Sequence, residues 1–133
     1  MALVVDTDVT SFLFKKDTRA ALYAPRLSGH MLVISFQTLA ELELWALSAG
    51  WGDRRKQELE QHLRRYIVQD SSPDICRRWA EVQASARRRG RPVAAADAWV
   101  AATALSLEVP LVTNNESHFS NIPGLKVLSE KQP

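Results

Sequence analysis

Short apolar runs without polar alternation place the strongest limit on what this chain can fold into. Residues 3–5 (LVV), 31–35 (MLVIS) and 110–113 (PLVT) are apolar almost throughout. A strand with one face in water alternates between apolar and polar side chains, so these runs indicate strands that are buried on both faces. Buried strands that alternate with helical patterns are typical of an α/β domain with a mainly parallel sheet.

Further elements follow from periodicity and capping residues. Two more strands are expected at residues 67–70 and 125–129. Six helices are expected at residues 8–14, 17–27 with an end near Pro25, 36–50 behind a Ser35 cap, 53–67, 72–90 and 94–108. The last of these is apolar around nearly its whole circumference, which predicts a buried helix.

Two sets of side chains are expected to face the core from these helices. Leu59, Leu63 and Ile67 recur at helical spacing, so they should share one buried face of the helix 53–67. Three tryptophans fall within apolar helix patterns and are expected in the core: Trp45, Trp79 and Trp99.

Composition excludes several classes of protein. The chain has 133 residues, which fits a single domain over 1–133, and its one cysteine, Cys76, excludes a disulfide framework. We expect Cys76 to be buried or half-buried. The histidines His30, His62 and His118 match no zinc spacing and are expected at surface or turn positions. There is no basic leader segment and no apolar run of ~20 residues, so we expect a soluble cytoplasmic protein that does not enter a membrane.

Charge is distributed unevenly along the chain. Residues 51–91 carry eleven Lys and Arg side chains against six Asp and Glu, while the rest of the chain has more acids than bases. A basic surface near an acidic site would suit a polyanionic ligand, although a solvated helical surface explains the same charges.

Acidic and amide side chains follow several of the expected strands. Asp6 ends the first strand, and the turn Asn115-Glu116 follows the run 110–113. Asp97 lies in the first turn of the apolar helix 94–108, where no Lys or Arg within the next turn offsets its burial. Glu41 or Glu43 joins them, because periodicity does not choose between the two. Functional groups gather at the carboxyl ends of parallel strands, so these oxygens are candidate ligands for Mg²⁺ or Mn²⁺.

The stretch Asp6-Thr7-Asp8-Val9-Thr10 resembles the D-x-D-x-T motif of haloacid-dehalogenase-like phosphatases. In that family Asp6 would be the nucleophile and Asp8 the general acid/base, and Ser35 would match a second motif. The resemblance stops there, because no lysine occurs between Lys56 and Lys126 and no acidic pair follows the run 110–113.

The sequence also resembles a PIN domain, and specifically a VapC-type toxin ribonuclease, over nearly its whole length. The matching stretches occur in the family's order and spacing: VVDTDV, ISFQTLAELELW, GRPVAAADAWVAATAL and LVTNNESHFSNIPGLKVL. Position by position, Asp6 and Asp97 match metal-site aspartates, and Glu41 matches the glutamate of a T-x-x-E segment. Asn115 stands at the fourth site position, where relatives carry Asp or Asn.

The second resemblance implies a fold, an activity and partners. The fold would be a three-layer α/β/α sandwich, and the activity that of an Mg²⁺-dependent endoribonuclease, with Mn²⁺ as a possible substitute. Asp6, Asp97 and Glu41 would serve the metal and Asn115 would assist catalysis. The substrate would be an RNA such as a tRNA or rRNA, and the partners a VapB-type antitoxin and a second copy in a homodimer. An inactive PIN-like binding module is the non-enzymatic alternative.

Three residues depart from the PIN pattern. Asp8 replaces a commoner Asn and adds a negative charge near Asp6. Asn115 makes the fourth site position neutral, and His118 stands where relatives usually carry an acid before Phe119. The resemblance assigns no role to Glu116.

Overall fold

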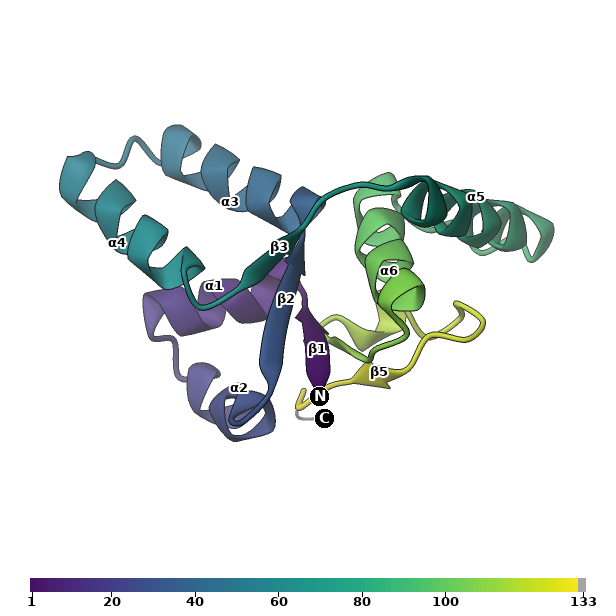
Figure 1. Ribbon diagram of the computed structural model, residues 1–133, viewed down its shortest axis with the longest axis horizontal. Helices are drawn as coiled ribbons and strands as arrows, with labels where there is room; N and C mark the ends of the chain where they lie inside the picture. The colour runs from purple at the N-terminus through teal and green to yellow at the C-terminus, as the bar shows by residue number, and fades with distance from the viewer. Residues whose placement is uncertain (132–133) are drawn as a thin grey trace.

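A fully parallel five-stranded sheet forms the centre of the molecule, and the computed structural model describes residues 1–131 (Figure 1). The strand order is β3-β2-β1-β4-β5, and every neighbouring pair is parallel. The strands are β1 (Ala2–Val5), β2 (Met31–Ser35), β3 (Ile67–Gln69), β4 (Leu111–Val112) and β5 (Val127–Leu128). The predicted α/β class with a mainly parallel sheet is confirmed, and all of its strands are parallel.

Helices cover both faces of the sheet, as the sandwich requires (Figure 1). Leu3 and Val5 of β1 pack with α1 and α2 on one face, whereas Val4 packs with α5 and α6 on the other. Successive strand residues point to opposite faces, so one apolar run supplies both cores. The helices are α1 (Thr7–Lys15), α2 (Ala20–Leu27), α3 (Phe36–Ser48), α4 (Asp53–Leu63), α5 (Pro73–Arg88) and α6 (Ala95–Leu107).

The strand order places a topological switch point at the carboxyl ends of β1 and β4, and we call this region the crevice. The chain adds β2 and β3 on one side of β1, then crosses back through α5 and α6 to place β4 on the other side. The connections leave β1 and β4 in opposite directions, and such switch points are where parallel α/β sheets bind ligands. The Asp6 backbone N–H donates to the Val112 carbonyl at 2.9 Å, which holds the two strand ends together.

Helix α6 is buried along most of its length, as predicted. Ala98, Ala101, Ala102 and Ala104 have no exposed surface, and their small side chains let α6 lie close to the sheet and to α5. Burial of α6 brings Asp97, in its first turn, into the interior of the fold.

Two helix ends differ from the expectations. α4 ends at Leu63, and Ile67 belongs to the edge strand β3, where its side chain is exposed. The buried face of α4 is formed by Leu59 and His62 instead. α2 ends at Leu27, as expected, with Pro25 in its last turn, but it begins at Ala20 rather than at residue 17.

His62 and Cys76 correct the expectations made from composition. His62 is buried, whereas Cys76 is exposed on α5. His62 belongs to an aromatic cluster between α1, α3 and α4, formed by Phe14, Trp45, Trp51, His62 and Tyr66. A histidine reaches the core here because aromatic rings surround it and Tyr66 lies within hydrogen-bonding distance.

The tryptophans expected in the core are only half-buried. Trp45 lies at the edge of the aromatic cluster, and Trp79 stacks on Trp99 between α5 and α6 at 4.9 Å between ring centroids. Within residues 1–131, no helix is long and apolar enough to cross a membrane.

Candidate active site

Asp6 is the most deeply buried acid of the crevice. It follows β1 and caps α1, and its Oδ1 accepts the Thr7 N–H at 2.8 Å. Its Oδ2 accepts the Thr113 hydroxyl at 2.8 Å, and Thr113 in turn accepts the Asn115 N–H at 3.0 Å. The carboxylate is therefore fixed by both strands of the switch point, and only 6% of the residue is exposed.

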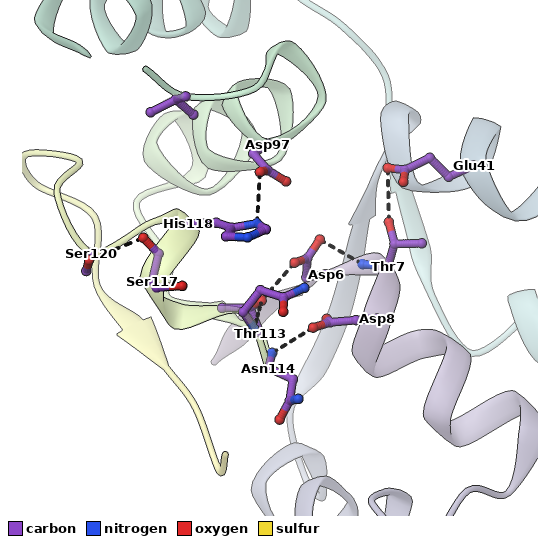
Figure 2. A network of polar contacts seen from close by, with 12 residues as sticks. Asp6, Thr7, Asp8, Glu41, Asp97, Thr113, Asn114, Ser117, His118 and Ser120 are labelled. Carbon is purple, nitrogen blue, oxygen red and sulfur yellow. Dashed lines mark hydrogen bonds and ion pairs between the residues drawn. The ribbon is translucent and has the colours of Figure 1, made fainter. Parts of the chain in front are cut away.

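Asp8 braces the loop after β4. Its Oδ1 accepts the Val9 N–H at 2.7 Å, and its Oδ2 accepts the Asn114 N–H at 3.0 Å. Figure 2 shows the Asp8 side chain directed toward Asn114. Both carboxylate oxygens are engaged by backbone donors, which suits a bracing role better than that of a mobile general acid.

Asp97 faces the crevice from the opposite core layer. It comes from the first turn of α6, and His118 of the short 3₁₀ helix η1 (Glu116–His118) contacts it. The His118 Nδ1 lies 3.2 Å from the Asp97 Oδ2, and both side chains are drawn on the far side of Asp6 from Glu41 in Figure 2.

Glu41, rather than Glu43, turns toward the site. Glu43 is exposed, whereas Glu41 is partly buried and its Oε1 lies 3.2 Å from the Thr7 hydroxyl. Thr7 also lies 3.0 Å from the hydroxyl of Thr38, which is fully buried one turn before Glu41 on α3. Glu41 is thus linked to Asp6 through the residue that follows Asp6.

The surroundings of the acids in the crevice disfavour their ionised forms. Burial first, and then the nearby Asp8, raise the pKa of Asp6 to about 7, with a smaller contribution from Asp97. Burial also raises the pKa of Asp8 and that of Asp97. Within residues 1–131, no Lys or Arg side chain forms an ion pair with any of the three. Buried acids that lie close together without a Lys or Arg ion-pair partner suit a bound cation.

The donor set fits an ion that keeps much of its water. No group of three or more Asp, Glu, His or Cys side chains within the described part of the chain is arranged to hold a metal unaided. Mg²⁺ is commonly bound through one or two carboxylates with several waters, and Asp6 and Asp97 supply such a pair. Asn115 is exposed, and it is linked to the site through its backbone N–H.

Several supporting residues escaped the sequence analysis. Thr7 and Thr38 link Glu41 to the site, and Asn114 receives the Tyr23 hydroxyl at 2.7 Å on its Oδ1. Tyr23 is fully buried, so it anchors the loop after β4 from beneath. The position of Thr7 directly after Asp6 was a signal for its role, whereas nothing near Tyr23 or His118 in sequence indicates their partners.

Comparison with known proteins identifies the family. The model of the PIN domain matches residues 3–125. This chain belongs to the PIN-domain family. The PIN interpretation of the stretch Asp6–Thr10 is thereby favoured over the phosphatase interpretation.

Similar proteins narrow the family further. This PIN domain is 30% identical to "Ribonuclease VapC1" of Haemophilus influenzae, with 95% of this chain and 96% of the relative covered. It is 27% identical to the "tRNA(fMet)-specific endonuclease VapC" of Shigella flexneri, over 95% and 96% of the two chains. A solved structure of VapBC-1 from nontypeable H. influenzae has a chain that is 29% identical, covers 98% of each chain and superposes with a TM-score of 0.82. The PIN domain is therefore a homologue of VapC-type toxin ribonucleases over nearly its full length.

Proposed function

We propose that this PIN domain is an Mg²⁺-dependent endoribonuclease, the toxin half of a VapBC-type toxin–antitoxin pair that acts in the cytoplasm. One observation carries the proposal. Asp97 lies near enough to Asp6 at the switch point to raise its pKa, burial raises the pKa of both, and within residues 1–131 neither forms an ion pair with a Lys or Arg. Family membership then favours RNA as the substrate class.

Each site residue has its own role in the proposed mechanism. Asp6 and Asp97 would hold Mg²⁺, or Mn²⁺ in its place, and Glu41 would bind the same ion or orient the attacking water. When bound, the ion would neutralise phosphate charge and lower the pKa of water. Thr113 holds the Asp6 carboxylate in place, and Asn115 extends this link into the loop that would face the RNA. Attack by water leaves a 5′-phosphate and a 3′-hydroxyl.

Surface charge supports a polyanionic substrate. Six cations of the basic middle are exposed and form no ion pair within residues 1–131: Lys56, Arg64, Arg65, Arg87, Arg88 and Arg91. Free surface cations attract the phosphate backbone whatever its sequence. One curated relative is named for tRNA(fMet), so tRNA is the first substrate that we propose to test, with rRNA as the second.

Exposed apolar side chains support a protein partner. Leu44 and Leu47 protrude from α3, and Ile67 and Val68 are exposed on the edge strand β3. Unpaired edge strands and exposed apolar patches are typical of interaction surfaces. We propose that a VapB-type antitoxin and a second copy of this chain are the partners.

The test measures cleavage and its products. The protein is purified without antitoxin and incubated with tRNA or rRNA in Mg²⁺, in Mn²⁺ and in EDTA, and a small phosphomonoester serves as the control substrate. We expect metal-dependent cuts that leave 5′-phosphate ends and no release of phosphate from the monoester. Cleavage that persists in EDTA, or phosphate release without RNA cleavage, would refute the proposal.

A further inference from the structure

A second cleft opens beside Asp97, and the ribonuclease site itself does not explain it. Its volume is about 310 Å³, and it lies between the segment Arg91–Ala94 before α6 and residues 117–122. We call it the side cleft. Asp97 lines one wall, so the side cleft is continuous with the candidate active site.

The lining of the side cleft is apolar within and polar at several points. Val93 is partly buried and Ile122 is buried, whereas Arg91, His118 and Asn121 are exposed around them. Ligand sites combine apolar walls with a few polar groups that fix orientation, and about 300 Å³ lies at their small end. The cleft therefore suits one flat heteroaromatic group rather than a long chain segment.

His118 supplies a ring that is fixed along one edge. Its Nδ1 contacts Asp97 at 3.2 Å, and 55% of the side chain remains exposed. Bases of single-stranded RNA stack on aromatic side chains of this kind. Relatives usually carry an acid at this position, and a carboxylate there would instead add negative charge beside Asp97 and repel the RNA.

Asn121 and Arg91 offer complementary polar contacts. The Asn121 carbonyl accepts the Arg89 Nη1 at 3.0 Å, which ties this loop to the end of α5. The Asn121 side-chain amide carries a donor and an acceptor of the kind that a base edge requires. Arg91 is exposed and forms no ion pair within residues 1–131, so it is available to a phosphate.

Resting on the proposed ribonuclease function, we propose that the side cleft receives the base of the nucleotide next to the cleaved phosphodiester. His118 stacks on the base, Asn121 contacts its edge and Arg91 contacts the flanking phosphate. The enzyme then selects a base at one position beside the cut.

Binding without cleavage tests this subsite directly. Fluorescence anisotropy in EDTA compares labelled octamers of A, of C and of U with an octamer of abasic ribonucleotides. Losing a base–aromatic stack should weaken binding, so we expect the wild type to prefer the best base-bearing octamer over the abasic one by ~10-fold. Equal affinities, or no binding of any octamer, would overturn the subsite.

Variants assign the effect to the cleft. His118→Ala should lower the preference for bases to ~2-fold or less, whereas His118→Phe, which keeps a ring, should retain most of it. Asn121→Ala should reduce discrimination among A, C and U. Ser120→Ala, in the same loop but outside the cleft lining, should change nothing. A base preference that survives both His118→Ala and Asn121→Ala would reject the subsite.

Mapping the cuts separates this inference from the proposed function. Mg²⁺-dependent cleavage whose flanking-base preference is unchanged in His118→Ala would leave the ribonuclease standing and remove the subsite. A base preference in binding that depends on His118, with no RNA cleavage by the wild type, would retain the subsite and reject the ribonuclease.

Discussion

Asp6 and His62 are both buried titratable groups, but their surroundings differ. α1 connects them, because Asp6 caps its start and Phe14, near its end, packs on His62 at 5.6 Å between ring centroids. Asp6 lies near two further acids, and its pKa is raised to about 7. Burial first, and then Arg65, lower the pKa of His62 to about 4.

The difference distinguishes a structural group, His62, from a proposed metal ligand, Asp6. Neutral His62 finds its polar and packing partners within the chain, since its Nε2 lies 3.2 Å from the Tyr66 hydroxyl and aromatic rings fill the space around it. The Asp6 carboxylate accepts hydrogen bonds, yet two other acids lie near it. A cation from outside the chain would therefore stabilise its ionised form. Changes at Asp6 should alter chemistry, and changes at His62 should alter stability.

The largest effect is expected at the acids themselves. Asp6→Asn or Asp97→Asn should lower the rate of RNA cleavage by ~10³-fold, because each removes a carboxylate from the proposed site of the ion that would activate water. Thermal unfolding in EDTA should show that both variants remain folded, since the amide keeps one acceptor oxygen and carries no charge to bury. Asp17→Asn, which changes an acid paired with Arg19 just after α1, is the matched control and should cleave normally. Near-normal cleavage by either site variant would show that the site is misassigned.

The aromatic cluster should respond in the opposite way. His62→Ala opens a cavity between Phe14 and Tyr66 and should lower the free energy of unfolding by ~2–3 kcal/mol. Urea denaturation measures this loss, and cleavage per folded molecule should stay within ~2-fold of the wild type. A variant with unchanged stability and lost cleavage would erase the distinction between the two regions.

The pH dependence of stability should show a smaller effect of the buried His62. His62 has a folded-state pKa of about 4, below the unfolded value of 6.5, so its stabilising contribution is complete above pH 6.5. That contribution falls as the pH drops from 6.5 toward 4, by on the order of 1–3 kcal/mol. Urea titrations of wild type and His62→Phe across this range isolate it by difference. Parallel curves for the two proteins would contradict the buried neutral imidazole.

Asp8→Asn is expected to have the smallest effect. The change removes a negative charge that raises the pKa of Asp6, and one side-chain oxygen remains to accept a backbone N–H. RNA cleavage should therefore stay within ~3-fold of the wild type, and it should rise if charge repulsion limits RNA binding. Parallel assays of RNA cleavage and phosphomonoester hydrolysis measure this. Loss of activity in Asp8→Asn would instead indicate that Asp8 acts as a general acid/base.

The strands of the sheet and the candidate acids could be identified from the sequence because their signals are local. Continuous apolar runs marked β1 and β2, and an acid in an otherwise apolar helix marked Asp97. The choice of Glu41 over Glu43 needed the resemblance, since the two are both compatible with the helix pattern of α3. His62 was wrongly expected at the surface, because its burial depends on Phe14 and Tyr66 meeting around it. The contact between His118 and Asp97 likewise depends on how η1 packs against α6, which no local pattern encodes.

The hydrogen bond between Thr113 and Asp6 also has a consequence for the order in which the protein is made. The two residues are 107 positions apart, so Asp6 leaves the ribosome long before the strand that fixes it exists. Chains begin to fold from the N-terminus during synthesis, and contacts this distant in sequence form late. A nascent chain that has formed β1, β2 and β3 still lacks half of its crevice. The proposed toxin therefore stays harmless to the RNA that surrounds it until translation of its own message is nearly complete.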